Sequence, residues 1–215
     1  MRPRTVVGCH LNFKGAWAAM EPAMHQEPHF KPPAHAVLYL KPPNTYEPFG
    51  RAVVLPPDVQ EVEVGATLGV VIGAPAARLS EQEAMDFVWG YAVVNDVTVP
   101  HTAVLRPPIK QKCRDTFCRI EDPVPKAQVP DPGRLAIRAY VNGELKGSNH
   151  TSNLIRSAPR LLAEITEFMS LERGDIVLMG VPENMPRVRA GDAYAIEIDQ
   201  VGRLDGVIRA EGAAA

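Results

Sequence analysis

Residues 62–73 read VEVGATLGVVIG, a run rich in β-branched residues that contains Gly65. This composition is typical of a strand, and a glycine inside a strand often marks the close approach of another backbone or a ligand. A second strand is predicted at Tyr91–Val99. Between them, Ser80 and Glu83 have the spacing of a capping box, which predicts a short helix. These residues therefore indicate two strands joined by a short helical connection.

The sequence on either side of these two strands also predicts mostly β-strands. Strands are predicted at residues 36–40, 52–55, 135–141, 174–180, 193–199 and 202–208. Asn142-Gly143 follows one of these strands and is a strong hairpin signal. Apolar residues at spacings of three and four predict an amphipathic helix that begins near Ser157–Pro159, because proline is tolerated in a first helical turn. We therefore predict one β-rich α+β domain with two or three short helices.

The composition limits both the fold and the partners. The 215 residues include 21 prolines in clusters such as Pro56-Pro57 and Pro107-Pro108, which end helices and exclude a helical bundle. Lys and Arg number 23 against 25 Asp and Glu, and this balance disfavours nucleic acid as a partner. No run approaches the roughly 20 apolar residues that span a bilayer. Because the three cysteines also lack a CxxC spacing, we expect a cytoplasmic protein without a membrane partner.

Few residues point to chemistry by their spacing alone. The sequence contains no GxSxG, P-loop, GxGxxG or HExxH motif. Asp96 ends the predicted strand YAVVND, where a carboxylate either caps a turn or acts at a functional rim, and the residues favour neither interpretation. Lys110, Lys112 and Arg114 form a cationic cluster able to bind carboxylates, although a solvated basic loop is the favoured interpretation. These residues are candidates for a site without defining its reaction.

Eight strings, taken in order along nearly the whole chain, resemble segments of the fumarylacetoacetate hydrolase superfamily. The strings are LNF (11–13), LYLKPPNT (38–45), GATLGVVIG (65–73), AMDFVWGYAVVNDVTVP (84–100), RPPIKQKCRDTFC (106–118), YVNGEL (140–145), FMSLERGDIVLMGVP (168–182) and AGDAYAIEIDQVGRL (190–204). The resemblance implies a mixed β-roll that assembles into homo- or hetero-oligomers. It also implies an irregular N-terminal or lid segment over residues 1–50, packed on a catalytic-type domain over residues 51–212.

Within this superfamily, three of the strings are most similar to the amino-terminal half of the two-domain decarboxylase/isomerases of homoprotocatechuate degradation. These strings are GATLGVVIG, NDVTVP and RPPIKQKCRDTFC. The resemblance implies a subunit equivalent to that half, which acts on a dicarboxylate or tricarboxylate 2-oxo acid beside a homologous metal-bearing subunit.

The resemblance also implies a set of site residues. Members of the family hold a divalent cation, commonly Mg²⁺, with two glutamates of an ExE strand and the aspartate of an ND pair. Here Asp96 matches the aspartate, whereas Gly65 and Thr67 occupy the glutamate positions. Because one carboxylate cannot replace three, we expect this chain not to bind Mg²⁺.

The cationic residues of the family pattern are retained. Lys112 matches the family lysine beside the substrate carboxylate or oxyanion, and Lys41 matches the lysine of the LK-PNT loop. Arg114 lies in the matching KxRD string. The resemblance thus implies catalysis by Lys112 and Asp96 and substrate binding by Lys41 and Arg114.

Three functions follow from this pattern. The first is an enzymatic subunit with a degenerate metal site, and the second is a noncatalytic partner of a metal-bearing paralogue. The third and weaker alternative is an acylpyruvate-type hydrolase. It is disfavoured because the His and Glu of the family's lid dyad, which would activate water, fall at about Ala16 and Ala19. A further departure from the family pattern is Val181, at the position of the threonine of the usual TGTP turn.

Overall fold

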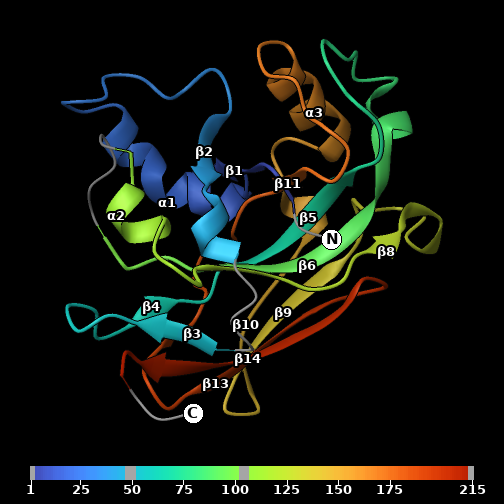
Figure 1. Cartoon of the computed structure of the whole chain (residues 1–215). Helices are drawn as coiled ribbons and strands as arrows, with labels where there is room; N and C mark the ends of the chain where they lie inside the picture. Colours follow the sequence, from blue (N-terminus) through green and yellow to red (C-terminus); the bar gives the residue numbers. More distant parts are fainter. Residues whose placement is uncertain (1–2, 47–51, 102–106, 213–215) are drawn as a thin grey trace.

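A computed structural model describes residues 3–46, 52–101 and 107–212, which form two main sheets and three α-helices (Figure 1). The larger sheet has the strand order β2-β1-β11-β5-β6-β7, and β8 pairs with β6 beside this path. Its strands are β1 (Val6–His10), β2 (Val37–Lys41), β5 (Ala66–Ile72), β6 (Val88–Asp96), β7 (Cys118–Ile120), β8 (Val124–Pro125) and β11 (Ile176–Leu178). Only β1 and β11 run parallel in this sheet, so the sheet is mixed.

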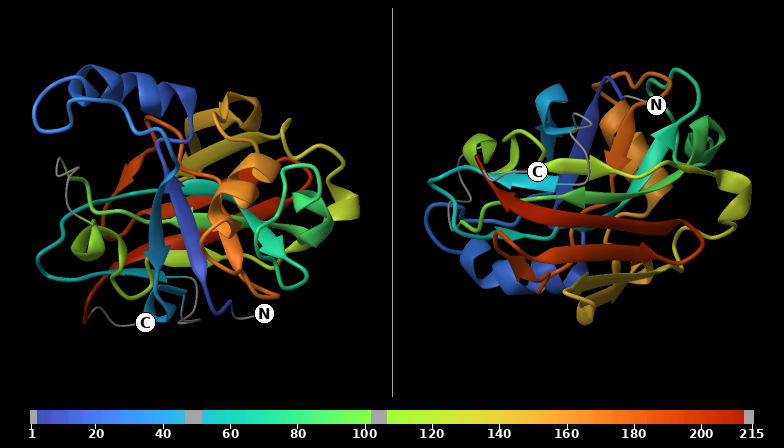
Figure 2. Two further views of the ribbon diagram at one scale, coloured as in Figure 1. Left: turned by 90° about the horizontal axis from the view of Figure 1, so that it is seen from above. Right: turned by 60° about the horizontal axis from the view of Figure 1, so that its bottom comes forward.

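The second sheet has the order β10-β9-β13-β14-β3 and contains one parallel pair, β14 with β3. Its strands are β3 (Ala52–Leu55), β9 (Ala136–Val141), β10 (Glu144–His150), β13 (Ala193–Ile198) and β14 (Gly202–Ala210). A short ribbon joins β4 (Val62–Glu63) to β12 (Arg187–Val188). Figure 2 shows the long β13 and β14 strands lying across the molecule below the larger sheet.

The helices lie around the larger sheet. They are α1 (Lys14–Met24), α2 (Ile109–Lys112) and α3 (Ala158–Thr166). Figure 1 shows α1 and α2 together on one side and α3 on the other. Single 3₁₀ turns are η1 (Pro43–Tyr46), η2 (Ala84–Phe87), η3 (Lys126–Gln128) and η4 (Thr151–Asn153). None of the helices among the described residues is long and apolar enough to cross a bilayer.

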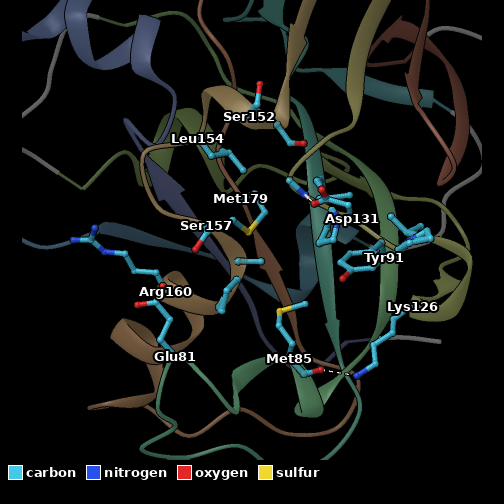
Figure 3. A pocket seen from close by; sticks show the side chains of 18 of the residues that line it. Glu81, Met85, Tyr91, Lys126, Asp131, Ser152, Leu154, Ser157, Arg160 and Met179 are labelled. Atoms are coloured by element: carbon cyan, nitrogen blue, oxygen red, sulfur yellow. Dashed lines mark hydrogen bonds between the residues drawn. The ribbon is translucent and has the colours of Figure 1, made fainter.

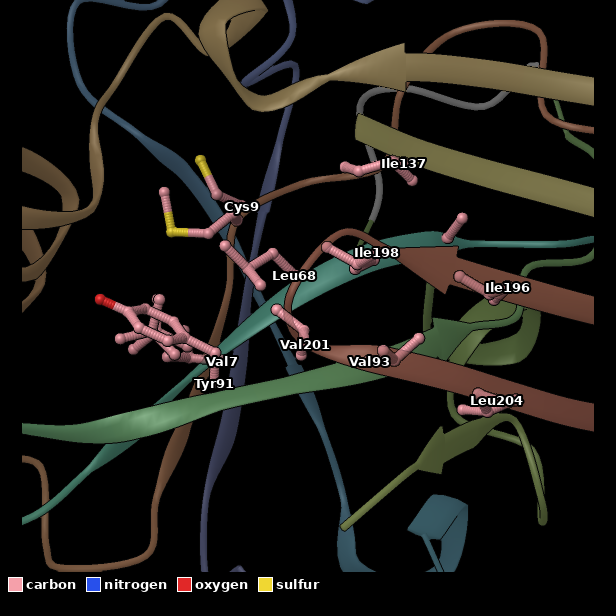
Figure 4. Packing of buried hydrophobic residues seen from close by; sticks show 14 of the residues in the cluster. Val7, Cys9, Leu68, Tyr91, Val93, Ile137, Ile196, Ile198, Val201 and Leu204 are labelled. Atoms are coloured by element: carbon pink, nitrogen blue, oxygen red, sulfur yellow. The ribbon is translucent and has the colours of Figure 1, made fainter. Parts of the chain in front are cut away.

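The main core lies between the two sheets. Buried residues of β5 and β6, such as Leu68 and Val93, belong to one cluster with Ile137 of β9 and Ile196 of β13 (Figure 4). The next residue along β6, Val94, belongs to a second cluster on the opposite face of the larger sheet. Side chains alternate between the faces of a strand, so Asp96 shares the face of Val94.

The predicted strands, hairpin and main helix are confirmed. Asn142 and Gly143 have positive φ values of 51° and 83° and connect β9 to β10, as the Asn-Gly signal requires. Helix α3 begins immediately after Ser157 with proline in its first turn. The capping-box pair Ser80 and Glu83 is also present, with a hydroxyl–carboxylate hydrogen bond of 2.5 Å, although it starts only a 3₁₀ turn.

The first fifty residues contain more regular structure than the prediction of an irregular segment allowed. That prediction is wrong for β1 and α1, whereas the strand predicted at residues 36–40 is present as β2; β1 pairs with both β2 and β11 inside the larger sheet. The short apolar run Thr5–Gly8 pairs with a strand 170 positions later in the chain. The sequence of the run itself does not indicate this partner. The division into a lid over 1–50 and a domain over 51–212 stays a prediction.

A buried cation cluster around Asp96

Three of the four predicted site residues meet at one end of the larger sheet. Lys41 ends β2, Asp96 ends β6 and Lys112 ends α2. The Lys41 Nζ lies 2.9 Å from Asp96 Oδ1, and the Lys112 Nζ lies 2.9 Å from Asp96 Oδ2. The side chains of Lys41 and Asp96 are 0% exposed and that of Lys112 is 4% exposed. We call these three residues, together with Tyr39, the Asp96 cluster.

Tyr39 completes the cluster and was not singled out from the sequence. Its hydroxyl donates a hydrogen bond to Asp96 Oδ2, and the Lys112 ammonium lies 4.5 Å from the centre of its ring. The ring crosses β1 directly over Gly8, where an added Cβ would lie 2.2 Å from it. Side chains alternate between the two faces of a strand, so Tyr39 lies on the same face of β2 as Lys41. This alternation is the sequence pattern from which Tyr39 could have been identified.

The two ammonium groups have different hydrogen-bond partners. Lys41 forms an ion pair with Asp96 and donates hydrogen bonds to the backbone oxygens of Lys112 at 2.5 Å and Val97 at 3.3 Å, while Asp96 Oδ1 accepts no hydrogen bond from the described residues. Lys112 donates to Asp96 and, at 2.6 Å, to Thr98 Oγ1. Among the described residues, no third acceptor binds Lys112. Its remaining N–H is the group available to a ligand oxygen.

Opposing charges set the protonation of the cluster. Burial alone would raise the pKa of Asp96, but Lys112, Lys41 and the Tyr39 hydrogen bond outweigh it and hold that pKa well below its usual range. Burial lowers the pKa of Lys112, and the Asp96 carboxylate opposes this shift. With both lysines protonated, two positive charges face one negative charge. These four residues then carry one net positive charge, which favours an anionic ligand, and the half-buried Glu63 carboxylate acts on Lys112 from outside the cluster.

His10 lies at the edge of the cluster. Its ring stacks on Tyr39 with a centroid distance of 4.3 Å and a tilt of 40°. Burial, followed by the positive charge of Lys112, lowers the pKa of His10 to about 4. The imidazole is therefore neutral near pH 7 and does not add to the positive charge of the cluster.

Arg114, the fourth predicted site residue, has different partners. Its guanidinium pairs with Asp58 through two bonds of 3.0 and 2.9 Å, and its Nε donates to the Lys110 backbone oxygen. Asp58 is half exposed, so this pair belongs to the protein surface. The expected role of Arg114 in substrate binding therefore has no support from its contacts.

The residues at the family's metal position do not fit a divalent cation. Each Asp96 carboxylate oxygen lies 2.9 Å from a lysine ammonium nitrogen, and Gly65 and Thr67 supply no carboxylate, while Asp96 Oδ1 and the Thr67 hydroxyl form no hydrogen bond with the described residues. A Cβ built on Gly65 would lie 1.9 Å from the Asp96 backbone oxygen, so β5 and β6 have closed over the space of a side chain. Among the described residues, no group of three or more His, Cys, Asp or Glu side chains is arranged to hold a metal.

Comparison with known proteins agrees with this fold. The family model described as fumarylacetoacetate hydrolase, C-terminal, matches residues 5–209. The chain belongs to the fumarylacetoacetate hydrolase family. It is 39% identical over 178 residues to the 4-hydroxyphenylacetate degradation bifunctional isomerase/decarboxylase of Escherichia coli, covering 81% of this chain and 42% of that relative. The chain therefore spans less than half the length of that enzyme.

Two solved structures of the family show the same architecture. The 2-hydroxyhepta-2,4-diene-1,7-dioate isomerase of Mycobacterium marinum has a TM-score of 0.81 at 26% identity, over 99% of this chain and 77% of its own. The maleylpyruvate hydrolase of Sphingobium sp. SYK-6, solved with manganese(II) and pyruvate, has a TM-score of 0.79 at 27% identity, over 97% and 71%. The predicted family and mixed β-roll are thus confirmed, and a divalent metal is present in at least one relative.

Removal of the central carboxylate should destabilise the protein strongly. Asp96→Asn leaves two buried lysines without their counter-charge, and breaking a buried ion pair in this way costs about 3–5 kcal/mol. The matched control is Asp58→Asn, which removes an exposed partner of Arg114 and should change stability little. Urea unfolding at pH 7 measures both. Equal stabilities for the two variants would contradict a structural role for the Asp96 cluster.

The depressed pKa of His10 predicts an acid-sensitive window. Between pH 6.5 and about 4 the unfolded state protonates this histidine while the folded state does not, so stability falls as the pH falls. Lys112, Asp96, His101 and Lys41 are the charged or titratable groups that act on it. His10→Phe, which keeps the stack on Tyr39, should reduce the loss across this window by about 3 kcal/mol. Chemical unfolding at both pH values checks this, with the exposed His25→Phe as a control that should retain the wild-type loss.

Metal ions should not stabilise this chain. We expect millimolar Mn²⁺ or Mg²⁺ to leave Tm unchanged, because no carboxylate of the Asp96 cluster is free to bind them. Differential scanning calorimetry with metal and with chelator measures this, and a metal-bearing family member provides the positive control. A rise in Tm that Thr67→Val or Asp96→Asn removes would show that the family's metal site is functional here.

Proposed function

We propose that the chain is a subunit of a 5-oxopent-3-ene-1,2,5-tricarboxylate decarboxylase / 2-hydroxyhepta-2,4-diene-1,7-dioate isomerase of 4-hydroxyphenylacetate (homoprotocatechuate) degradation, with a degenerate metal site. The similarity to the Escherichia coli enzyme and to the Mycobacterium marinum isomerase supports the pathway. The Asp96 cluster is the observation that carries the rest of the proposal. It combines the two lysines that match the family pattern with an Asp96 that lacks the two glutamates of the metal triad.

The retained chemistry is suited to a substrate with several carboxylates. One net positive charge in a buried setting attracts an anion, and the free N–H of Lys112 gives that anion a donor. Loss of CO₂ leaves the bonding electron pair on the substrate as an enolate, and isomerisation passes through a similar enolate after a proton leaves. An ammonium group at the enolate oxygen stabilises both without a metal.

Assembly with a metal-bearing homologue is part of the proposal. The chain spans 42% of the bifunctional relative, so the rest of that relative is long enough to contain a second homologous half. A noncatalytic partner role is the main alternative, favoured by the complete burial of the Lys41–Asp96 pair. An acylpyruvate-type hydrolase has less support, because Ala16 and Ala19 on α1 offer no base to activate water.

Activity measurements separate these roles. We expect the purified chain alone to isomerise 2-hydroxyhepta-2,4-diene-1,7-dioate slowly and to gain activity with a metal-bearing homologue in Mg²⁺, but not in chelator. The decarboxylase substrate is assayed in the same way. Full activity of the chain alone in chelator would instead assign the whole reaction to this chain and contradict the need for a partner.

A pair of lysines on α2 tests whether this chain's own site participates. In the assembled complex, Lys112→Ala should lower kcat/KM by about 10²-fold or more if its ammonium stabilises the enolate. Lys110 has a side chain that is 76% exposed on the same short helix, so Lys110→Ala is the matched control and should retain activity. If both variants keep the wild-type rate and KM, the site is idle and the chain is a noncatalytic partner.

A further inference from the structure

A cavity lies on the face of the larger sheet opposite the Asp96 cluster. Its volume is about 810 Å³, and it opens between the loop around η3 and the N-terminal end of α3 (Figure 3). Leu68 of β5 and Tyr91 of β6 reach it from the sheet and belong to the core cluster on that face. A volume of this size is within the range of pockets that hold small organic molecules.

The inner wall of the cavity is apolar and contains two methionines. Met85 and Met179 line it together with Leu68, Leu154 and Val129. Figure 3 shows the Met85 and Met179 side chains lying on either side of the central space. Thioether groups make favourable contacts with aromatic rings and adapt to their shape. This wall is therefore suited to a flat aromatic body.

The rim of the cavity does not select a charged ligand. Lys126 and Arg160 contribute two positive charges, and Glu81 and Asp131 contribute two negative ones. Lys126 donates to the Met85 backbone oxygen at 2.7 Å, and Arg160 pairs with Glu164 at 3.1 Å. The balance of charge favours an uncharged ligand.

One polar group inside the cavity has no partner in the protein. Tyr91 is 1% exposed and lines the cavity, and no hydrogen bond to its hydroxyl is found among the described residues. Burial, with the negative charge of Asp131, raises the pKa of Tyr91 to about 12, so the hydroxyl keeps its proton. This hydroxyl faces the cavity, where a ligand oxygen that accepts its hydrogen bond would take the place of water.

We propose that this cavity is a binding site for a small uncharged aromatic molecule whose hydroxyl or carbonyl oxygen accepts a hydrogen bond from Tyr91. The ring lies between Met85 and Met179, and the oxygen points to β6. The site is separate from the Asp96 cluster, so the proposal does not depend on the reaction proposed for this chain.

Two probes that differ by one hydroxyl test the hydrogen bond. The fluorescence of 2-naphthol and of naphthalene is titrated with the full chain at pH 7. We expect wild type to bind 2-naphthol more tightly than naphthalene by about three- to tenfold, the value of one hydrogen bond. Tyr91→Phe should remove this preference and leave naphthalene binding unchanged. Tyr140→Phe, at a surface tyrosine, is the control and should keep the preference. A preference that survives Tyr91→Phe overturns the assignment.

The location of binding is tested without any substitution. With methyl-labelled methionine in the wild-type protein, 2-naphthol should shift the NMR signals of Met85 and Met179. It should leave those of Met20 and Met24 on α1 in place. Shifts confined to other methionines would overturn the proposal. Absence of binding to the assembled protein would also overturn it, because a partner chain then fills the cavity. This readout stands even if Tyr91→Phe folds poorly.

Discussion

The carboxylate of Asp96 ends a buried strand, and a charge in that position needs compensation. Two lysines provide it, one from β2 and one from α2, with a tyrosine hydroxyl as a third partner. Three segments that are distant in sequence are thereby joined at one end of the larger sheet. Desolvation makes such a cluster costly unless every partner is present, so its members are mutually dependent. Lys41 at the end of β2 and Lys112 at the end of α2 thus both reach the end of β6.

The loss of two carboxylates beside this cluster distinguishes the chain from the metal-binding pattern of its family. Three carboxylates around a divalent ion form a site whose charge is supplied by an exchangeable cation. Here the positive charge is covalently attached as two ammonium groups, and the glutamate positions are Gly65 and Thr67. The backbone has closed into the space at Gly65. A site of this kind has a permanent attraction for anions and no requirement for metal, and the proposed function uses that attraction.

The larger sheet is buried on both faces, and the two faces carry different groups of side chains. Alternation along β6 directs Tyr91 and Val93 to the core cluster and Val94 and Asp96 to the other face. The apolar cavity beside Tyr91 and the charged cluster around Asp96 thus share β5 and β6 without sharing side chains. Burial on both faces explains why these strands read as continuous apolar runs.

The sequence by itself determined the β-rich class, the Asn142-Gly143 hairpin and the start of α3, because turn and helix-cap preferences are local. Through family resemblance it also indicated Lys41, Asp96 and Lys112. Tertiary structure alone decided that β1 lies inside the main sheet, that Arg114 pairs with Asp58, and that Tyr39 and His10 border the cluster. These features depend on contacts between residues far apart in the chain. Their energies come from burial and charge pairing, which no local pattern encodes.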